Sequence, residues 1–204
     1  MEFVKICAAV LASGTGTRFG EDKIAALIAG KQLVCYPVDD LAAAGVNDIM
    51  LIVRPDTEAE KLACKEGVKI VRNTDYREGM ASAIRTAVRH AGKDCDGLLL
   101  VNGDMPFFGH SGFRDMISIF MKNTNCIVSA TLAGTRRNPA IFPKSMMDSL
   151  LALTGEDGGR KIMALYPENV VEYAVRSHIA VMDIDTKADL DRANSLFLRM
   201  GQIK

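Results

Sequence analysis

The stretch that decides the fold runs from Phe3 to Lys23 and reads FVKICAAVLASGTGTRFGEDK. Its first part, Phe3–Leu11, is a nearly continuous apolar run that leads into glycines. Such a run is typical of a central strand that is buried on both faces, as in a parallel sheet. Its second part, Leu11–Lys23, is a glycine-rich loop with two basic residues. The sequence thus predicts a buried strand that opens directly into a candidate anion-binding loop.

The rest of the chain alternates strand-like apolar runs with helical patterns. Further strands are predicted over Asp48–Val53, Val68–Val71, Gly97–Val101, Cys126–Leu132 and Ile179–Ile184. Helices are predicted over Val34–Ala44, Thr57–Cys64, Met80–Ala91 and Phe113–Met121, and two more are predicted to begin at Lys144 and at Thr186. In the last helix, Asp189 would complete a capping box with Thr186. The residues of this helix expected to be buried are Leu190, Ala193, Phe197 and Met200. This alternation indicates an α/β fold in which helices cover both faces of a mostly parallel, twisted sheet, in a single three-layer domain spanning residues 1–204.

Composition narrows the classes of function. The 204 residues include 25 acidic and 25 basic side chains, so no general basic field favours nucleic acid or an anionic membrane. The five cysteines are scattered and form no paired metal or disulfide spacing, which favours a reducing compartment and a cytoplasmic location. The apolar start, Met1–Ala12, is too short to span a bilayer and lacks the pattern of a signal peptide.

The loop Leu11–Lys23 is suited to a polyphosphate. Glycines let the backbone approach an anion closely, so that consecutive N–H groups can point at phosphate oxygens. Arg18 adds a bidentate fork and Lys23 a compact charge. A Walker A loop fits poorly because Ile24 follows Lys23 where a hydroxyl residue is needed. The dinucleotide fingerprint of an NAD(P) dehydrogenase also fits poorly, because the third glycine is one residue late and no acid ends the second strand.

The loop and several later motifs together resemble the MobA-like NTP transferases, and in particular their molybdenum cofactor cytidylyltransferase branch. The matching segments occur in the same order as in that family: Leu11–Lys23, Asn73–Ile84 (NTDYREGMASAI), Gly103–Pro106 (GDMP), Asn138–Phe142 (NPAIF), Gly155–Arg160 (GEDGGR) and Asp183–Leu190 (DIDTKADL). The chain departs from the family pattern at Ser13, at Arg137 and at Gly155–Asp157.

The resemblance implies a GT-A-type, Rossmann-like nucleotidyltransferase fold and a set of site residues. Residues 1–104 would form the nucleotide-binding half, and residues 105–204 the acceptor-side half. Catalysis would depend on Arg18, Lys23 and Asp104, and the nucleotide would bind at Leu11, Ala12, Ser13, Gly14, Gly16, Arg18, Lys23, Asp75, Gly79 and Ser82. Ser82 is expected on the polar face of its helix. Asn138 and Arg160 would contact the acceptor.

The resemblance also implies a divalent metal, Mg²⁺ or alternatively Mn²⁺. Asp104 would be the principal ligand and Asp185 the second, with Asp183 as the competing choice. Both Asp104 and Asp185 are expected just past a strand, at the sheet edge where α/β proteins bind ligands.

The expected reaction transfers a nucleoside monophosphate from a nucleoside triphosphate to a phosphorylated small molecule and releases pyrophosphate. By resemblance, CTP is the favoured nucleotide and molybdopterin or its molybdenum form the favoured acceptor, with GTP or a sugar or alcohol phosphate as alternatives. A molybdoenzyme or another protein of the cofactor pathway is a possible partner. From another class of function, a non-catalytic nucleotide-sensing protein also remains open at this point.

Overall fold

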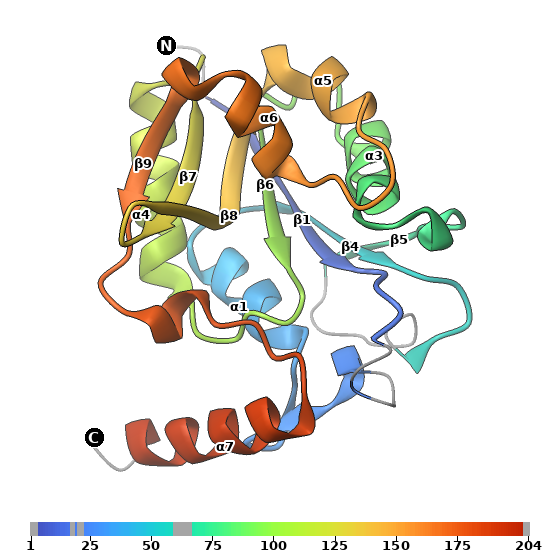
Figure 1. Cartoon of the computed structure of the whole chain (residues 1–204), viewed down its shortest axis with the longest axis vertical. Helices are drawn as coiled ribbons and strands as arrows, with labels where there is room; N and C mark the ends of the chain where they lie inside the picture. The colour runs from blue at the N-terminus through green and yellow to red at the C-terminus, as the bar shows by residue number, and fades with distance from the viewer. Residues whose placement is uncertain (1–3, 17–18, 20–22, 59–66, 202–204) are drawn as a thin grey trace.

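The computed structural model describes residues 4–16, 19, 23–58 and 67–201. Seven strands form one twisted sheet in the order β5-β4-β1-β6-β8-β7-β9 (Figure 1). The strands are β1 (Ile6–Ala12), β4 (Asp48–Val53), β5 (Lys69–Arg72), β6 (Gly97–Asn102), β7 (Ile127–Leu132), β8 (Thr135–Pro143) and β9 (Val170–Ala174). Of the six pairings between these strands, four are parallel and the two made by β8 are antiparallel. The predicted mostly parallel sheet is confirmed.

Helices cover both faces of the sheet, which confirms the three-layer α/β architecture. The helices α1 (Cys35–Ala43) and α4 (Gly109–Lys122) pack on one face, where Leu41, Phe113 and Phe120 join a buried apolar cluster. The other face is covered by α3 (Met80–His90), α5 (Met147–Leu151) and α6 (Gly159–Leu165), as Figure 1 shows. The strand β1 is buried from Cys7 to Ala12, as its apolar sequence predicts.

Two elements in the second half differ from the prediction. The predicted strand Ile179–Ile184 is wrong, because His178–Val181 forms a 3-10 helix and residues 182–184 belong to no strand. The edge strand is instead β9, in which Glu172 and Ala174 are exposed and the other three residues are partly buried. An edge strand with mixed burial carries a weak apolar signal, whereas Ile184 is fully buried without belonging to a strand. The predicted helix Thr57–Cys64 lies mostly outside the described residues.

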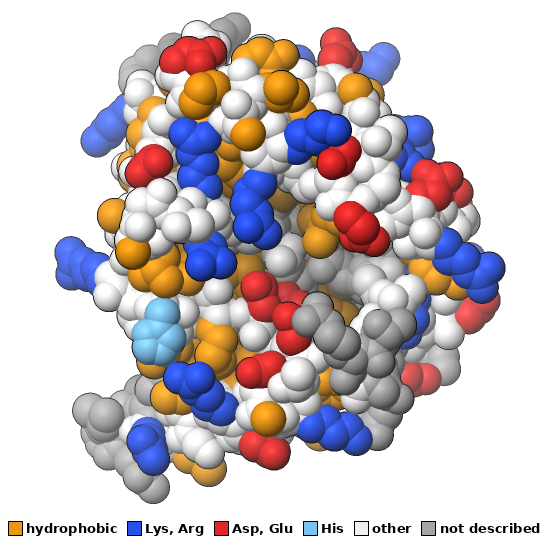
Figure 2. Space-filling model, in the orientation of Figure 1, with side chains coloured by type: hydrophobic (Ala, Val, Ile, Leu, Met, Phe, Trp, Pro, Cys, Tyr) orange, Lys and Arg blue, Asp and Glu red, His pale blue; other side chains and the backbone are white. Residues whose placement is uncertain are grey.

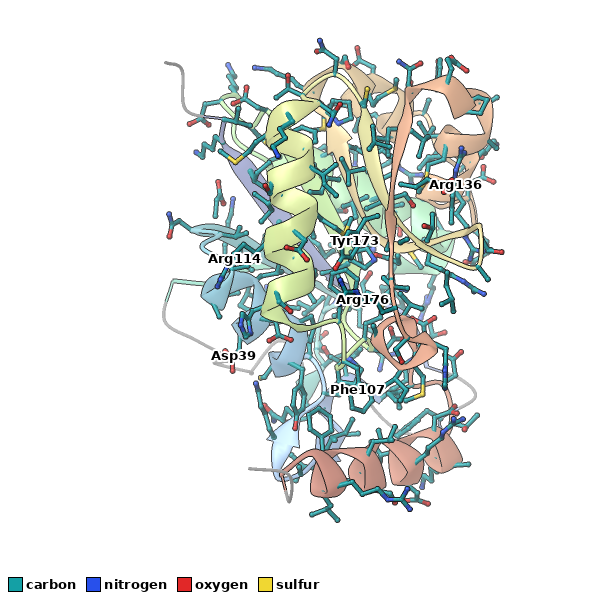
Figure 3. All side chains as sticks on the ribbon, turned by 90° about the vertical axis from the view of Figure 1, so that its left-hand side faces the viewer. Asp39, Phe107, Arg114, Arg136, Tyr173 and Arg176 are labelled. Atoms are coloured by element: carbon teal, nitrogen blue, oxygen red, sulfur yellow. The ribbon has the colours of Figure 1, made fainter. Side chains whose placement is uncertain are left out.

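The last helix, α7 (Lys187–Gly201), lies away from the sheet and against the small hairpin of β2 (Leu27–Ile28) and β3 (Lys31–Gln32). The predicted capping box is confirmed, because Asp189 Oδ2 accepts from Thr186 N at 2.8 Å and Thr186 Oγ1 accepts from Asp189 N at 3.1 Å. Phe107 stacks on Phe197 at 4.7 Å between ring centres and joins α7 to the body of the domain (Figure 3). The side chain of Met200 lies outside the described part of the chain.

No helix within the described residues is long and apolar enough to cross a membrane.

Candidate active site

Two adjoining cavities open at the edge of the sheet where β1 and β6 end. One has a volume of about 530 Å³ and is lined by the glycine-rich loop, and the other has a volume of about 420 Å³ and lies toward β8 and α6. Leu11, Asn102 and Asp183 line both cavities. Figure 2 shows acidic side chains gathered beside a hollow in the middle of this face, with Lys and Arg side chains above them. A site with this shape can hold two ligands side by side.

Lys23 forms two ion pairs with carboxylates in this region. The Lys23 ammonium lies 2.6 Å from Asp104 Oδ2 and 3.1 Å from Asp185 Oδ1. The backbone N–H of Ile184 donates to the carbonyl of Asp104 at 3.0 Å, which places the segment containing Asp185 beside the end of β6. Burial lowers the pKa of Lys23, but the charges and hydrogen bonds of Asp104 and Asp185 outweigh burial and raise that pKa above its ordinary value.

Asp104 also has a carboxylate oxygen that could bind a cation. Its Oδ1 is buried and has no hydrogen-bond partner, although a buried polar atom normally has one. Within the described residues, no three His, Cys, Asp or Glu side chains lie close enough to hold a metal ion by themselves. Asp104 and Asp185 would therefore leave positions for phosphate oxygens and water, which is the coordination that Mg²⁺ prefers.

Asp183 lies in the same acidic group but has different surroundings. Burial, and then the negative charge of Asp104, raise the pKa of Asp183 to about 6, while the Asn102 side chain opposes the rise by donating to Asp183 Oδ1 at 3.4 Å. A carboxyl group with this pKa is partly protonated near neutral pH. Without a bound cation, the surroundings of Asp183 therefore favour its protonated form more than water does.

The larger cavity brings together most of the predicted nucleotide-binding residues. Its lining includes Leu11, Ala12, Ser13, Gly14, Gly16, Lys23 and Gly79 from that set, together with Arg54, Tyr76 and Arg77, which the prediction did not include. Arg18 lies outside the described residues. Asp75 is exposed and does not line either cavity.

The expected solvent-facing position of Ser82 is wrong. Ser82 is 1% exposed, and its hydroxyl accepts from Asn73 Nδ2 at 2.9 Å. The polar side of α3 near its start is covered by the segment after β5, so helical periodicity alone misplaces this serine. Ser82 lines neither cavity.

The smaller cavity contains both predicted acceptor residues, Asn138 and Arg160. Arg137 and Lys161 add positive charge to its lining, and an apolar floor is formed by Ile84, Leu100, Met105, Ala140, Phe142 and Met163. The carboxamide of Asn138 donates to Asn102 Oδ1 at 2.8 Å, and its own Oδ1 is buried without a hydrogen-bond partner. This cavity suits a molecule that combines an anionic group with an apolar or flat body.

Asn102 and Glu156 are among the residues between the two cavities that the sequence analysis missed, as is Met80. All three line both cavities. Asn102 is the polar last residue of β6, directly before Gly103 and Asp104, so its place at the carboxyl end of a buried strand could have identified it. Glu156 reaches the start of α3, where its carboxylate lies 3.4 Å from Met80 N, and only the fold brings these segments together.

Comparison with known proteins gives one family match across most of the chain. The model of the MobA-like NTP transferase domain matches residues 8–172. A probable molybdenum cofactor guanylyltransferase from Thermococcus gammatolerans is 34% identical over 121 residues, which cover 58% of this chain and 60% of that protein. The bifunctional protein GlmU from Sinorhizobium medicae is 34% identical over 103 residues, 48% of this chain and 23% of its own length. The chain thus spans less than two thirds of these relatives.

Solved structures share the fold over nearly the whole chain. Rv0371c from Mycobacterium tuberculosis superposes with a TM-score of 0.82 at 23% identity, over 94% of this chain and 98% of that one. Molybdopterin-guanine dinucleotide biosynthesis protein A from Archaeoglobus fulgidus superposes with a TM-score of 0.72 at 23% identity, again over 94% and 98%. At these identities the likeness establishes the nucleotidyltransferase-type fold.

Proposed function

Since the chain belongs to the MobA-like NTP transferase family, we propose that it transfers a nucleoside monophosphate from a nucleoside triphosphate to a phosphorylated acceptor and releases pyrophosphate. The observation that carries this proposal is the group formed by Lys23, Asp104 and Asp185 on the wall of the cavity beside the glycine-rich loop. The glycine-rich loop side would take the triphosphate, and the cavity beside β8 would take the acceptor. Residues 1–104 would then supply most of the nucleotide side, and residues 105–204 most of the acceptor side.

The chain's own residues would act mainly by positioning and charge. In the reaction, an oxygen of the acceptor phosphate forms a bond to the α-phosphorus while the bond from that phosphorus to the bridging oxygen of pyrophosphate breaks. Lys23, with Arg18 as a further candidate, would hold the oxygens on which negative charge gathers. Arg137, Arg160 and Lys161 line the acceptor cavity and would hold the attacking phosphate close to the α-phosphorus.

The donor set fits a divalent cation. Asp104, whose Oδ1 is buried without a hydrogen-bond partner, and Asp185 would hold Mg²⁺, or Mn²⁺ as an alternative. When bound, the cation would neutralise negative charge on the phosphates. A structure of Rv0371c from Mycobacterium tuberculosis was determined in complex with manganese, which supports the choice of metals.

For the substrates, we propose CTP and molybdopterin or its molybdenum form. The motif resemblance favours CTP, and the apolar floor with a cationic rim suits a flat heterocycle that carries a phosphate. GTP is the second candidate, because the relative from Thermococcus gammatolerans is described as a probable guanylyltransferase. A sugar phosphate is the third candidate acceptor, since a glucose-1-phosphate thymidylyltransferase from Mycolicibacterium smegmatis is 34% identical over 111 residues. A partner protein would be a molybdoenzyme or another protein that handles this cofactor.

The contact between Lys23 and Asp104 supports a catalytic function over a nucleotide-sensing one, and the cysteine pattern supports a cytoplasmic location. Lys23 and Asp104 are both present and in contact, whereas a non-catalytic protein has no need to keep them. The five cysteines lie at scattered positions with no paired spacing, which supports a reducing compartment and hence the cytoplasm.

Pyrophosphate release would test the proposal directly. The purified protein would be incubated with Mg²⁺, each of CTP, GTP, ATP and UTP, and either molybdopterin or glucose 1-phosphate. We expect release to require one nucleotide and one acceptor together, with CTP and molybdopterin giving the highest rate. Absence of release for every pair, in protein that also shows no thermal shift with any nucleotide, would refute the proposed function.

A further inference from the structure

A buried polar network lies directly behind the wall of the nucleotide cavity. Its centre is Asn73, which follows β5 and is 1% exposed. Asn73 Nδ2 donates to Ser13 Oγ at 3.0 Å and to Ser82 Oγ at 2.9 Å, and its Oδ1 accepts from Thr86 Oγ1 at 3.4 Å. Its backbone N–H donates to the carbonyl of Val53 at 2.7 Å. The side chain of Asn73 therefore uses both of its donor hydrogens and its acceptor inside the protein.

The network joins the glycine-rich loop to two segments that lie at least 60 positions later in the sequence. Ser13 belongs to the glycine-rich loop after β1, Asn73 follows β5, and Ser82 lies in the first turn of α3. Ser82 Oγ in turn donates to the carbonyl of Gly79 at 2.8 Å. Ser13 and Gly79 both line the nucleotide cavity, whereas Asn73, Ser82 and Thr86 do not. The network thus sets the distance between two walls of the cavity from behind.

The residues that follow Ser13 in the glycine-rich loop, Gly14 and Thr15, are exposed, and the next buried residue of the loop that the structure describes is Phe19. A side chain at Gly14 would meet no atom within 4 Å, and Gly16 has a φ of +59°, a backbone region that non-glycine residues seldom adopt. Ser13, by contrast, is 5% exposed because Asn73 holds its hydroxyl inside. An exposed glycine loop loses considerable backbone entropy when it binds a ligand unless a neighbouring contact has already restricted it.

We propose that Asn73 is a positioning residue that holds Ser13 and the glycine-rich loop in the conformation that binds the nucleoside triphosphate. This role rests on the proposed function for the identity of the ligand, but the restraint on the loop exists without any ligand. A purely apolar residue at this buried position would leave Ser13 Oγ and Ser82 Oγ without their shared donor. The loop would then sample other conformations. The affinity for the nucleotide would fall in proportion to the decrease in the population of the conformation that binds it.

Two single substitutions separate positioning from general stability. Ser13→Ala removes the link between Asn73 and the loop but keeps the links to α3. Thr86→Val removes the link between Asn73 Oδ1 and α3 at a similar depth but leaves the loop contact in place. Each variant loses one hydrogen bond of the same buried asparagine. If that asparagine has only a structural role, the two variants should show similar falls in melting temperature and the same rate of hydrogen exchange in the loop.

The first measurement is amide hydrogen exchange of residues 13–16 in the ligand-free proteins, and the second is the Kd of each nucleotide with Mg²⁺ by calorimetry. We expect Ser13→Ala to speed loop exchange and to raise the nucleotide Kd by ~10-fold, with a smaller effect on kcat, because a displaced binding group weakens a ligand strongly. Thr86→Val should leave both quantities near those of the natural sequence. Equal loop exchange in the two variants would overturn the proposal. If the natural sequence binds no nucleotide, the proposed function fails, and the exchange comparison still decides whether Asn73 restrains the loop.

Discussion

The ammonium of Lys23 lies 2.6 Å from Asp104 Oδ2, and the same ammonium lies 3.1 Å from Asp185 Oδ1. The side chains of Lys23 and Asp104 are 13% and 14% exposed, so this ion pair is largely withdrawn from water. In such surroundings each charge depends on the other, because removal of one partner leaves an uncompensated buried charge. Single substitutions of Lys23, Asp104 and Asp185 should therefore have different effects on metal binding and turnover.

The first prediction concerns Asp104. Asp104→Asn should lower pyrophosphate release at least ~100-fold, the scale of losing one preorganised charge-stabilising group. Asp185→Asn should act in the same direction but more mildly, and Asp183→Asn should have the smallest effect, because Lys23 forms ion pairs with Asp104 and Asp185, whereas Asp183 accepts a hydrogen bond from Asn102. Rates and melting temperatures measured on the same preparations would check this order. Normal turnover in folded Asp104→Asn would remove Asp104 from the site.

The second prediction is that Lys23 and a divalent cation compete for the same carboxylates. Lys23→Met should let Mn²⁺ bind without nucleotide at least ~10-fold more tightly than the natural sequence does, because the repulsion of a cation at contact distance is removed. Electron paramagnetic resonance of free Mn²⁺ would measure this binding. Turnover of the same variant should fall, since the triphosphate loses its lysine.

Lys31→Met is the matched control for this experiment. Lys31 pairs with Asp39 at 2.7 Å, and the two side chains are 35% and 39% exposed. No new Mn²⁺ site should appear in Lys31→Met. If Lys23→Met also gains no Mn²⁺ binding, the carboxylates beside Lys23 do not form the metal site.

The third prediction concerns the acceptor cavity. Arg160→Ala should raise the KM for the acceptor by ~10-fold or more and change the KM for the nucleotide less, because the lost charge-assisted hydrogen bonds are mainly to the acceptor phosphate. Arg160 lines both cavities, so a small nucleotide effect is expected as well. Arg89→Ala, at an exposed position of α3 outside both cavities, serves as the control. A larger rise in the nucleotide KM than in the acceptor KM would place Arg160 on the nucleotide side.

The fourth prediction concerns stability at the start of α3. Gly79 has φ +84° and ψ −165°, and a Cβ there would lie 2.6 Å from the carbonyl oxygen of Gly155. Gly79→Ala should therefore lower the free energy of unfolding by at least ~2 kcal/mol, because backbone strain and overlap with a main-chain atom add together. At Gly45, φ is +93° but no atom lies within 4 Å, so Gly45→Ala should cause only the strain, about 1 kcal/mol. Denaturant unfolding would measure both, and equal losses would show that the contact with Gly155 does not matter.

The sequence by itself determined the class of fold, the glycine-rich loop that we propose binds the triphosphate, and several individual elements. The run Phe3–Leu11, the strand Asp48–Val53 and the capping box of Thr186 and Asp189 were all predictable, since each depends on a local pattern of burial or hydrogen bonding. The position of Asp104 just after a buried strand also follows from local pattern. These features can be predicted without knowing which distant segments pack against each other.

Only the tertiary structure decided which distant residues share one site. It placed Lys23 between carboxylates 81 and 162 positions away, buried Ser82 under Asn73, and brought Glu156 to the start of α3. It also paired β9 with β7 while Ile179–Val181 entered a 3-10 helix. The physical reason is that periodicity reports how apolar a residue's own segment is, whereas burial and hydrogen bonding depend on the segment that packs against it, and that partner is chosen by the fold as a whole.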